Sequence, residues 1–172
     1  LASFALAAAP LIIFFVQNPD WAMRRSSQAG GDWAQIIPNY IHALGGIVWR
    51  GDEIVRHNIP GRPLVDPVQS IFFIVGLLCC LRRWREARFG LLVIWLGALI
   101  LPPALSAIPE HFGRIAGATA AIALIAGVGV IPVWQRLPRR PAIALVAAAF
   151  AFSAARTAYD YFTLWPRSPA YL

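Results

Sequence analysis

Residues 115–134, IAGATAAIALIAGVGVIPVW, form a 20-residue apolar run without a charged side chain, and this run decides the fold class. A helix needs about 20 mainly apolar residues to cross the hydrocarbon core of a membrane. The overall composition agrees, because 59% of the chain is hydrophobic and only 13% is charged, whereas soluble domains carry about 25% charged residues. The sequence therefore predicts an all-α, polytopic helical membrane protein.

Four further apolar segments accompany this run, and we expect one transmembrane domain over residues 1–172 with about five transmembrane helices. The expected spans lie near residues 1–16, 68–84, 89–105, 115–134 and 142–158. The second and fifth are short, but arginines at their ends can extend to the membrane surface. Because the chain starts at Leu1, inside an apolar run and without a basic leader region, we expect it to be the C-terminal part of a longer, truncated domain.

Two short loops rich in arginine orient these spans. Residues 82–88 and 136–140 together hold seven arginines. Short basic loops stay in the cytoplasm, so alternation of the spans places the 17–67 loop, the 106–114 loop and the C-terminus outside. Membrane topology thus accounts for the net charge of +7, and we expect a multi-pass protein of the cell (inner or plasma) membrane with no nucleic-acid partner.

The extracytoplasmic loop, residues 17–67, contains an apolar stripe with helical spacing. Over residues 32–49, large apolar side chains recur every three or four positions, which predicts an amphipathic helix. Asp32 is the expected N-cap, Gln35 lies in the capping-box position, and Pro38 is expected to kink the helix. Two interpretations remain open: the helix lies in the outer membrane interface, or its stripe packs on the missing part of the longer protein.

The first candidate binding residues lie in the stretch RHNIPGRPLVDP, residues 56–67. Its three prolines and one glycine exclude a regular helix and favour a stiff turn. Arg56 and Arg62 offer planar guanidinium donors that match a phosphate, and His57 can add a hydrogen bond. In the alternative interpretation, the two arginines pair with carboxylates of the same loop, namely Asp52, Glu53 or Asp66.

A second cationic cluster, Pro109-Glu110-His111-Phe112-Gly113-Arg114, opens the span near 115–134. His111 and Arg114 are three residues apart and share one face of a helix, and a helix N-terminus itself favours an anion. The alternative is ordinary anchoring of the span, with Glu110 pairing Arg114. We find no metal-ligand set, phosphate-cradling glycine loop or nucleophile triad, and we expect neither a metal nor a cofactor.

Arg56 to Pro63, followed by Asp66-Pro67 and a span, resembles a region of bacterial membrane glycosyltransferases of the GT-C class. Pro109 to Arg114 resembles the Pro-His-aromatic-x-Arg element of the same enzymes, with Glu110 inserted. The resemblance is to the family 39, protein-mannosyltransferase-like and aminoarabinose-transferase-like members, and it covers most of residues 10–165, the C-terminal part of their membrane domain. It implies transfer of a sugar from a polyprenyl-phosphate donor to an acceptor at the extracytoplasmic face. The lipid phosphate would be bound by Arg56, His57, Arg62, His111 and Arg114.

In that family the catalytic acidic residue lies in a first outer loop near the N-terminus. The resemblance therefore assigns no catalytic residue here, and we expect this chain alone to be inactive as an enzyme. Two other classes remain open, a transporter or flippase of lipid-linked sugars and a non-catalytic membrane subunit. A transporter should carry ionisable residues within its spans. The apolar runs 1–16, 68–81, 89–105, 115–134 and 142–155 contain no acidic or basic side chain.

Overall fold

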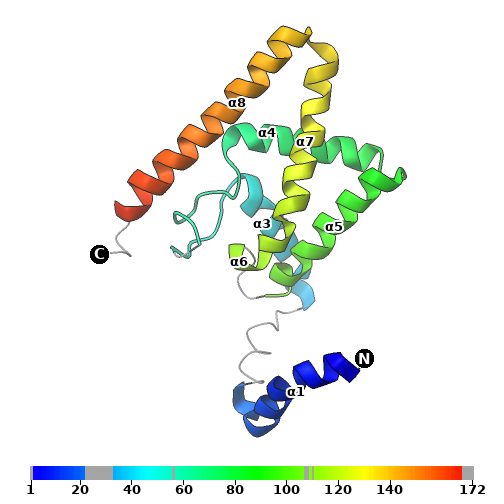
Figure 1. The fold of residues 1–172 in the computed structure, drawn as a ribbon, viewed down its shortest axis with the longest axis vertical. Helices are drawn as coiled ribbons and strands as arrows, with labels where there is room; N and C mark the ends of the chain where they lie inside the picture. Colours follow the sequence, from blue (N-terminus) through cyan, green and yellow to red (C-terminus); the bar gives the residue numbers. More distant parts are fainter. Residues whose placement is uncertain (1, 22–32, 56, 107–108, 110, 168–172) are drawn as a thin grey trace.

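The computed structural model describes residues 2–21, 33–55, 57–106, 109 and 111–167, and over those ranges the protein is all-α (Figure 1). Seven α-helices are described in these ranges: α1 (Ala2–Gln17), α3 (Ile36–Val48), α4 (Pro67–Arg82), α5 (Ala87–Ala104), α6 (Phe112–Ile115), α7 (Thr119–Arg136) and α8 (Arg139–Tyr159). Short 3₁₀ turns at Trp33–Gln35, Ala116–Ala118 and Trp165–Arg167 and a π-helical turn at Asp160–Leu164 adjoin them.

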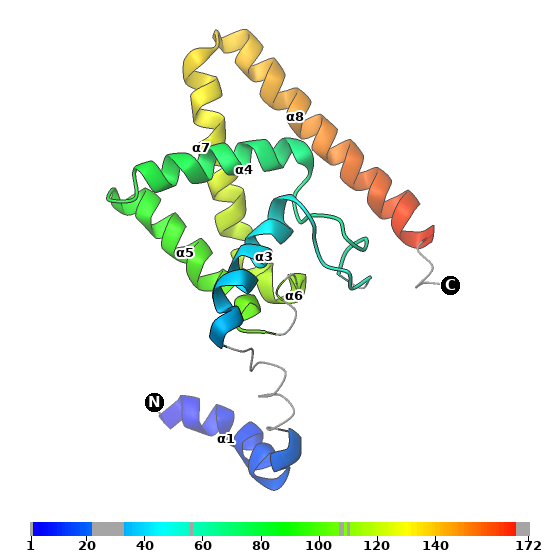
Figure 2. The ribbon, with the colours of Figure 1, turned by 180° about the vertical axis from the view of Figure 1, so that it is seen from behind.

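Within the described ranges, three helical segments are long and apolar enough to cross a membrane. They are α5, the segment Phe112–Arg136 that joins α6 to α7, and the segment Arg139–Arg167 that begins with α8. These segments overlap the predicted spans near 89–105, 115–134 and 142–158, so the expected all-α fold with long apolar helices is confirmed. Helices also form near 1–16 and 68–84, but α1 and α4 have only 16 residues each. In both ribbon views α1 lies apart from the other helices (Figures 1 and 2).

Local chemistry explains where α4 and α5 begin. The Asp66 side chain accepts hydrogen bonds from the backbone N–H groups of Val68 (2.8 Å) and Gln69 (3.0 Å), and Pro67 occupies the first helical position. After α4, Glu86 accepts hydrogen bonds from the side chains of Arg83 and Arg88, which closes the turn into α5. The two helices therefore meet at a charged, exposed turn.

Helices α4 and α7 cross with their backbones in direct contact. A Cβ atom added to Gly76 would lie 1.8 Å from the Ile125 carbonyl oxygen, and one added to Gly129 would lie 1.9 Å from the Phe72 carbonyl oxygen. Such distances exclude any side chain at either position, because real Cβ contacts lie beyond about 3 Å. Two glycines, one from each helix, thus let the backbones touch.

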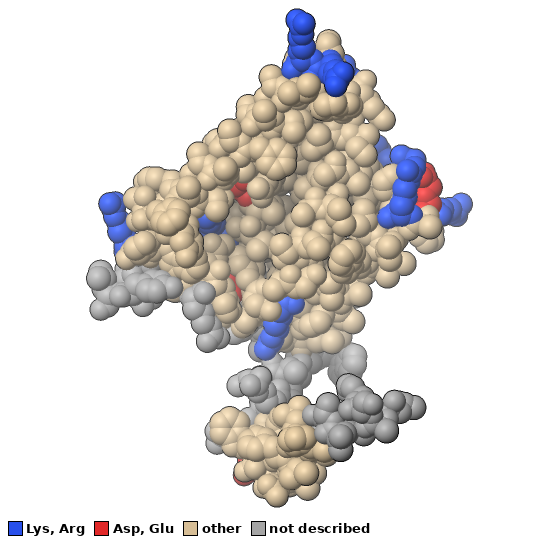
Figure 3. Space-filling view, viewed as in Figure 1, with Lys and Arg blue, Asp and Glu red and all other residues tan. Residues whose placement is uncertain are grey.

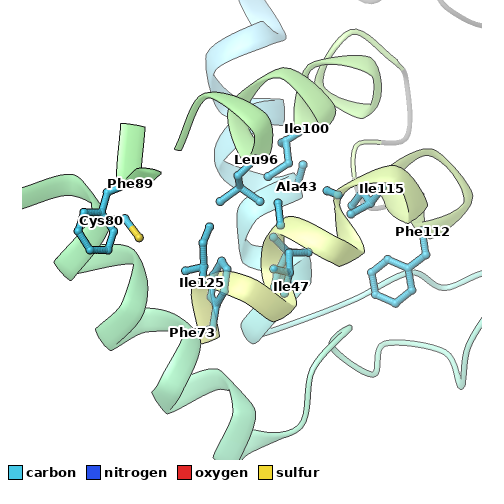
Figure 4. Packing of buried hydrophobic residues seen from close by; sticks show 13 residues of the cluster. Ala43, Ile47, Phe73, Cys80, Phe89, Leu96, Ile100, Phe112, Ile115 and Ile125 are labelled. Carbon is cyan, nitrogen blue, oxygen red and sulfur yellow. The ribbon is translucent and has the colours of Figure 1, made fainter. Parts of the chain in front are cut away.

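The hydrophobic core forms around α3, which packs along α5 (Figure 4). Ala43 and Ile47 of α3 are fully buried, and Tyr40 donates a hydrogen bond to the Gly97 carbonyl of α5 at 3.0 Å. On the opposite face Ile37 and Ile41 stay 73% and 64% exposed. The predicted helix over 32–49 is therefore present and amphipathic, with part of its apolar surface packed on the chain and part uncovered.

The start of α3 differs from the expectation. The α-helix begins at Ile36, after the 3₁₀ turn, and Gln35 occupies the N-cap position without a side-chain cap hydrogen bond. Pro38 therefore lies in the first turn, where a missing N–H costs nothing, rather than at an internal kink. The proposed N-cap Asp32 lies outside the described residues.

Charged side chains gather at the turns between helices (Figure 3). Arginines cluster at the α7–α8 turn and at the α4–α5 turn, whereas the helix surfaces between them carry mainly uncharged side chains. Figure 1 places both turns away from the loop of residues 51–66, which connects α3 to α4. Large apolar residues such as Ile71, Ile94 and Phe150 face outward, with 62%, 69% and 71% exposure. This pattern is the reverse of that on a soluble protein surface.

Candidate functional site

The loop of residues 51–66 folds back on itself and is pinned to the end of α3. Gly51 donates a backbone hydrogen bond to the Gly61 carbonyl, Gly61 donates to the Asp52 carbonyl, and Val65 donates to the Ile47 carbonyl of α3. Gly61 has a φ of +73°, a left-handed conformation that glycine adopts without strain. The prolines and glycine predicted a stiff turn, and the loop is a closed turn.

Asp52 is the residue that joins this loop to the start of α6. Its carboxylate is 1% exposed and accepts hydrogen bonds from His57 Nδ1 (2.6 Å) and from the backbone N–H groups of Phe112 (3.0 Å) and Ile54 (2.8 Å). Burial alone would raise the pKa of Asp52, but these hydrogen bonds and the nearby His57 together hold it below its usual value. Sequence reasoning treated Asp52 only as a counter-charge for arginine and missed this role.

The two predicted cationic clusters meet through their histidines. The rings of His57 and His111 lie 4.6 Å apart between centroids, inclined by 55°. A Cβ atom added to Gly113 would lie 3.2 Å from His111 Nδ1 and 3.5 Å from His57 Nε2, so a larger residue there would press on the His111 ring. Burial, with smaller contributions from His57 and Arg114, lowers the pKa of His111 and favours its neutral form.

Arg114 lies one turn beyond His111 and is half-buried. Its backbone N–H donates to the His111 carbonyl at 2.9 Å. Among the described residues, no carboxylate lies within ion-pair distance of its guanidinium. Arg114 thus has no carboxylate partner among the described residues, and the alternative partner Glu110 lies outside them, so binding of an anion by Arg114 stays a prediction.

Arg62 has a partner that sequence reasoning did not consider. Its Nη1 lies 2.9 Å from Asp160 Oδ2, at the end of α8, and Arg156 Nε lies 3.6 Å from the same oxygen. Asp160 is only 5% exposed, so its carboxylate lies inside the protein. Because Arg62 and Arg156 surround a single carboxylate, the group of three side chains carries a net positive charge. The Arg62 guanidinium is within ion-pair distance of Asp160 Oδ2, but it is not aligned to donate a hydrogen bond to that oxygen.

The expected acidic partners of Arg62 are engaged elsewhere. Glu53 pairs with Arg50 at 3.1 Å, Asp52 binds His57, and Asp66 caps α4. Near this loop the Trp165 indole N–H also donates to the Val55 carbonyl at 3.0 Å, which attaches the C-terminal segment to it. The remaining predicted binding residue, Arg56, lies outside the described residues.

Two hollows adjoin the site. One, of about 610 Å³, lies between α3 and the start of the loop and includes Asp52 in its wall. The other, of about 360 Å³, lies among α4, α7 and α8 and is lined mainly by apolar side chains, including Val68, Phe72 and Phe150. Leu64 and Val65, two and three residues beyond Arg62, form part of its wall. A cationic loop thus borders an apolar cavity.

Sequence reasoning found no metal-ligand set, but the fold brings one together. Asp52, His57 and His111 each offer a ligand atom, and these three atoms lie within 4.8 Å of one another. No sequence spacing identifies this set, because His111 follows His57 by more than fifty residues and joins it only through the fold. No protein-family model, curated protein or solved structure matches the chain.

Proposed function

We propose that the chain belongs to an integral-membrane glycosyltransferase that moves a sugar from a polyprenyl-phosphate donor to an acceptor at the extracytoplasmic face. The observation that carries the proposal is that the loop of Arg62 borders an apolar cavity among α4, α7 and α8, with Leu64 and Val65 of that loop in the cavity wall. A polyprenyl phosphate has the same two parts, a charged headgroup and an apolar chain. Bound in this way, its phosphate would lie at Arg62 and its chain would lie among the helices.

The proposed topology comprises five spans, with α3 at the outer interface and the site at the extracytoplasmic end. The arginine-rich α4–α5 and α7–α8 turns would face the cytoplasm, and both lie away from the 51–66 loop in Figure 1. The outward apolar side chains of α4, α5 and α8 suit contact with lipid. The protein would be a multi-pass protein of the cell membrane, with α1 and α4 as its shorter spans.

The proposed chemistry rests on charge at the phosphate. Arg114 has an unpaired guanidinium among the described groups, and Arg62 and Arg156 share one carboxylate. A phosphate can accept bidentate hydrogen bonds from such arginines, which stabilise negative charge as the lipid phosphate leaves the sugar. His57 and His111 would add hydrogen bonds from the other side of the loop, and Arg56 would complete the cationic set.

The test is binding of a polyprenyl phosphate to the full-length protein, compared with a polyprenol of equal length that lacks the phosphate. Arg62→Ala and Arg114→Ala should each weaken binding of the phosphate by about 10- to 100-fold, since a hydrogen bond to a charged group contributes about 1.5–3 kcal/mol. Neither variant should change binding of the polyprenol.

The matched control is Arg50→Ala, which removes an arginine of the same loop region whose side chain is 75% exposed and paired with Glu53. It should bind the phosphate like the wild type. The rate of sugar transfer from the polyprenyl-phosphate donor should fall most in the variant that loses the most affinity for the phosphate. Wild-type binding and wild-type transfer in both the Arg62 and Arg114 variants would disprove the proposal.

A further inference from the structure

Three potential metal ligands converge where the 51–66 loop meets the residue before α6. Asp52 and His57 belong to the loop, and His111 precedes Phe112, the first residue of α6. Their ligand atoms lie within 4.8 Å of one another. Zinc binds histidine nitrogen and carboxylate oxygen at about 2.0–2.2 Å, so ligand atoms around one ion lie about 3.3 Å apart. Adjustments of about 1 Å or less per side chain would bring the three atoms to that spacing.

His111 carries an independent sign that a ligand is bound here. Its Nδ1 atom is buried and has no hydrogen-bond partner among the described residues. Buried polar atoms are normally satisfied, because each unsatisfied one costs about 1–3 kcal/mol. This nitrogen lies close to Gly113, where an added Cβ atom would be 3.2 Å from it. A metal ion coordinated by His111 Nδ1 would remove this cost.

Asp52 is held rigidly enough to serve as the third ligand. The amides of Ile54 and Phe112 fix its carboxylate from two sides. Its short contact with His57 Nδ1, at 2.6 Å, is closer than two ligand atoms around one metal ion. An ion would therefore take the place of the proton shared by Asp52 and His57, and the two side chains would separate by less than 1 Å.

We propose that Asp52, His57 and His111 form a binding site for a divalent transition-metal ion of the zinc class. Two imidazoles and one carboxylate suit zinc or iron(II), whereas calcium and magnesium prefer sets made of oxygen ligands. Three protein ligands leave a coordination position open for water or an anionic oxygen, and Arg114, which has no carboxylate partner among the described residues, lies close enough to His111 to lower its pKa. The site goes beyond the proposed function, because it requires neither the lipid nor the sugar.

The test measures binding of Zn²⁺ alone to the full chain in detergent by calorimetry. Loss of an outer-shell partner typically costs 10- to 100-fold in metal affinity, so His57→Ala and His111→Ala, which remove direct ligands, should each cost at least about 100-fold. The matched control is His42→Ala, because His42 is the only other histidine of the chain. It should retain wild-type affinity.

A second measurement uses the wild-type protein and so does not depend on the folding of a variant. In protein labelled with ¹⁵N at its three histidines, Zn²⁺ should shift the resonances of two imidazoles and leave that of His42 unchanged. The proposal is overturned if the wild type does not bind Zn²⁺, if His42 responds like the other two, or if folded His57→Ala and His111→Ala proteins keep wild-type affinity.

Discussion

At the α4–α7 crossing two helix backbones touch through Gly76 and Gly129, whereas the end of α8 is attached to the 51–66 loop by polar side chains. Only 11% of the most apolar stretch of the α8 segment is buried, against 33% in the segment that contains α7. The crossing fixes the position of α7 by close packing. The attachment of α8 instead depends on Arg62, Asp160 and the Trp165 indole, which lie beside the candidate site.

This difference indicates how the site is supported. The crossing holds α7, and α7 continues back through α6 to Arg114 and His111, so those residues rest on a backbone that cannot shift without breaking the packing. Arg62 instead forms part of the attachment of α8. An anion that binds Arg62 must therefore share that arginine with Asp160, whereas an anion that binds Arg114 displaces no described partner.

The largest effect is expected at the crossing. Gly129→Ala would place a methyl group 1.9 Å from the Phe72 carbonyl oxygen, so the helices must separate along their contact. We expect the free energy of unfolding in detergent to fall by about 3 kcal/mol or more. The control is Gly127→Ala in the same helix, where an added Cβ meets nothing within 4 Å. That variant should be neutral or more stable by up to about 1 kcal/mol, because alanine favours the helix. Equal stability of the two variants would contradict the described crossing.

A smaller but still large effect is expected at the junction between the loop and α6. Asp52→Ala leaves two backbone amides and His57 without their acceptor, and we expect a loss of about 2–4 kcal/mol in the free energy of unfolding. The control is the neighbouring Glu53→Ala, which breaks only an exposed ion pair with Arg50 and should cost less than about 1 kcal/mol.

The pH dependence gives a second check on Asp52. Because the pKa of its carboxyl is lowered in the folded protein, its contribution is present above the unfolded value of 3.8 and is lost as the pH falls through the folded pKa. Acid titration of the unfolding free energy should therefore show a loss below about pH 4 that Asp52→Ala lacks. A variant that keeps the wild-type acid profile would exclude Asp52 as the acceptor at this junction.

The sequence predicted the long helices well because their signal is local. Runs of apolar residues identified the segments near 89–105, 115–134 and 142–158 by length alone. The crossing was not predicted, because glycine spacing within α7 does not say which helix approaches it. Gly129 lies in the predicted span, but its partner Gly76 is more than fifty residues away.

At the site the sequence identified residue types and the fold determined their partners. The two cationic clusters, at residues 56–67 and 109–114, were expected on the same side of the membrane. Their histidines, His57 and His111, do lie in contact. Which of the adjacent acids Asp52 and Glu53 turns inward depends on the path of the loop, since no regular helix or strand sets their direction. The part played by Asp160 was not predicted for a related reason, because its contact with Arg62 joins the end of α8 to a loop almost a hundred residues earlier.

The smallest effect, and the one that tests the comparison most directly, is the coupling between Arg62 and Asp160. A double-mutant cycle with Arg62→Ala and Asp160→Ala should give a coupling energy of about 1–2 kcal/mol, because the two side chains are 19% and 6% exposed. The same cycle on Arg50 and Glu53, which are 75% and 60% exposed, should give about 0–0.5 kcal/mol. Hydrogen exchange should locate the difference, with faster exchange of amides at the end of α8 in Arg62→Ala and unchanged exchange at the α4–α7 crossing. If exchange instead rises equally at the end of α8 and at the α4–α7 crossing, the two regions form one cooperative unit. In that case an anion that binds Arg62 would destabilise both regions together.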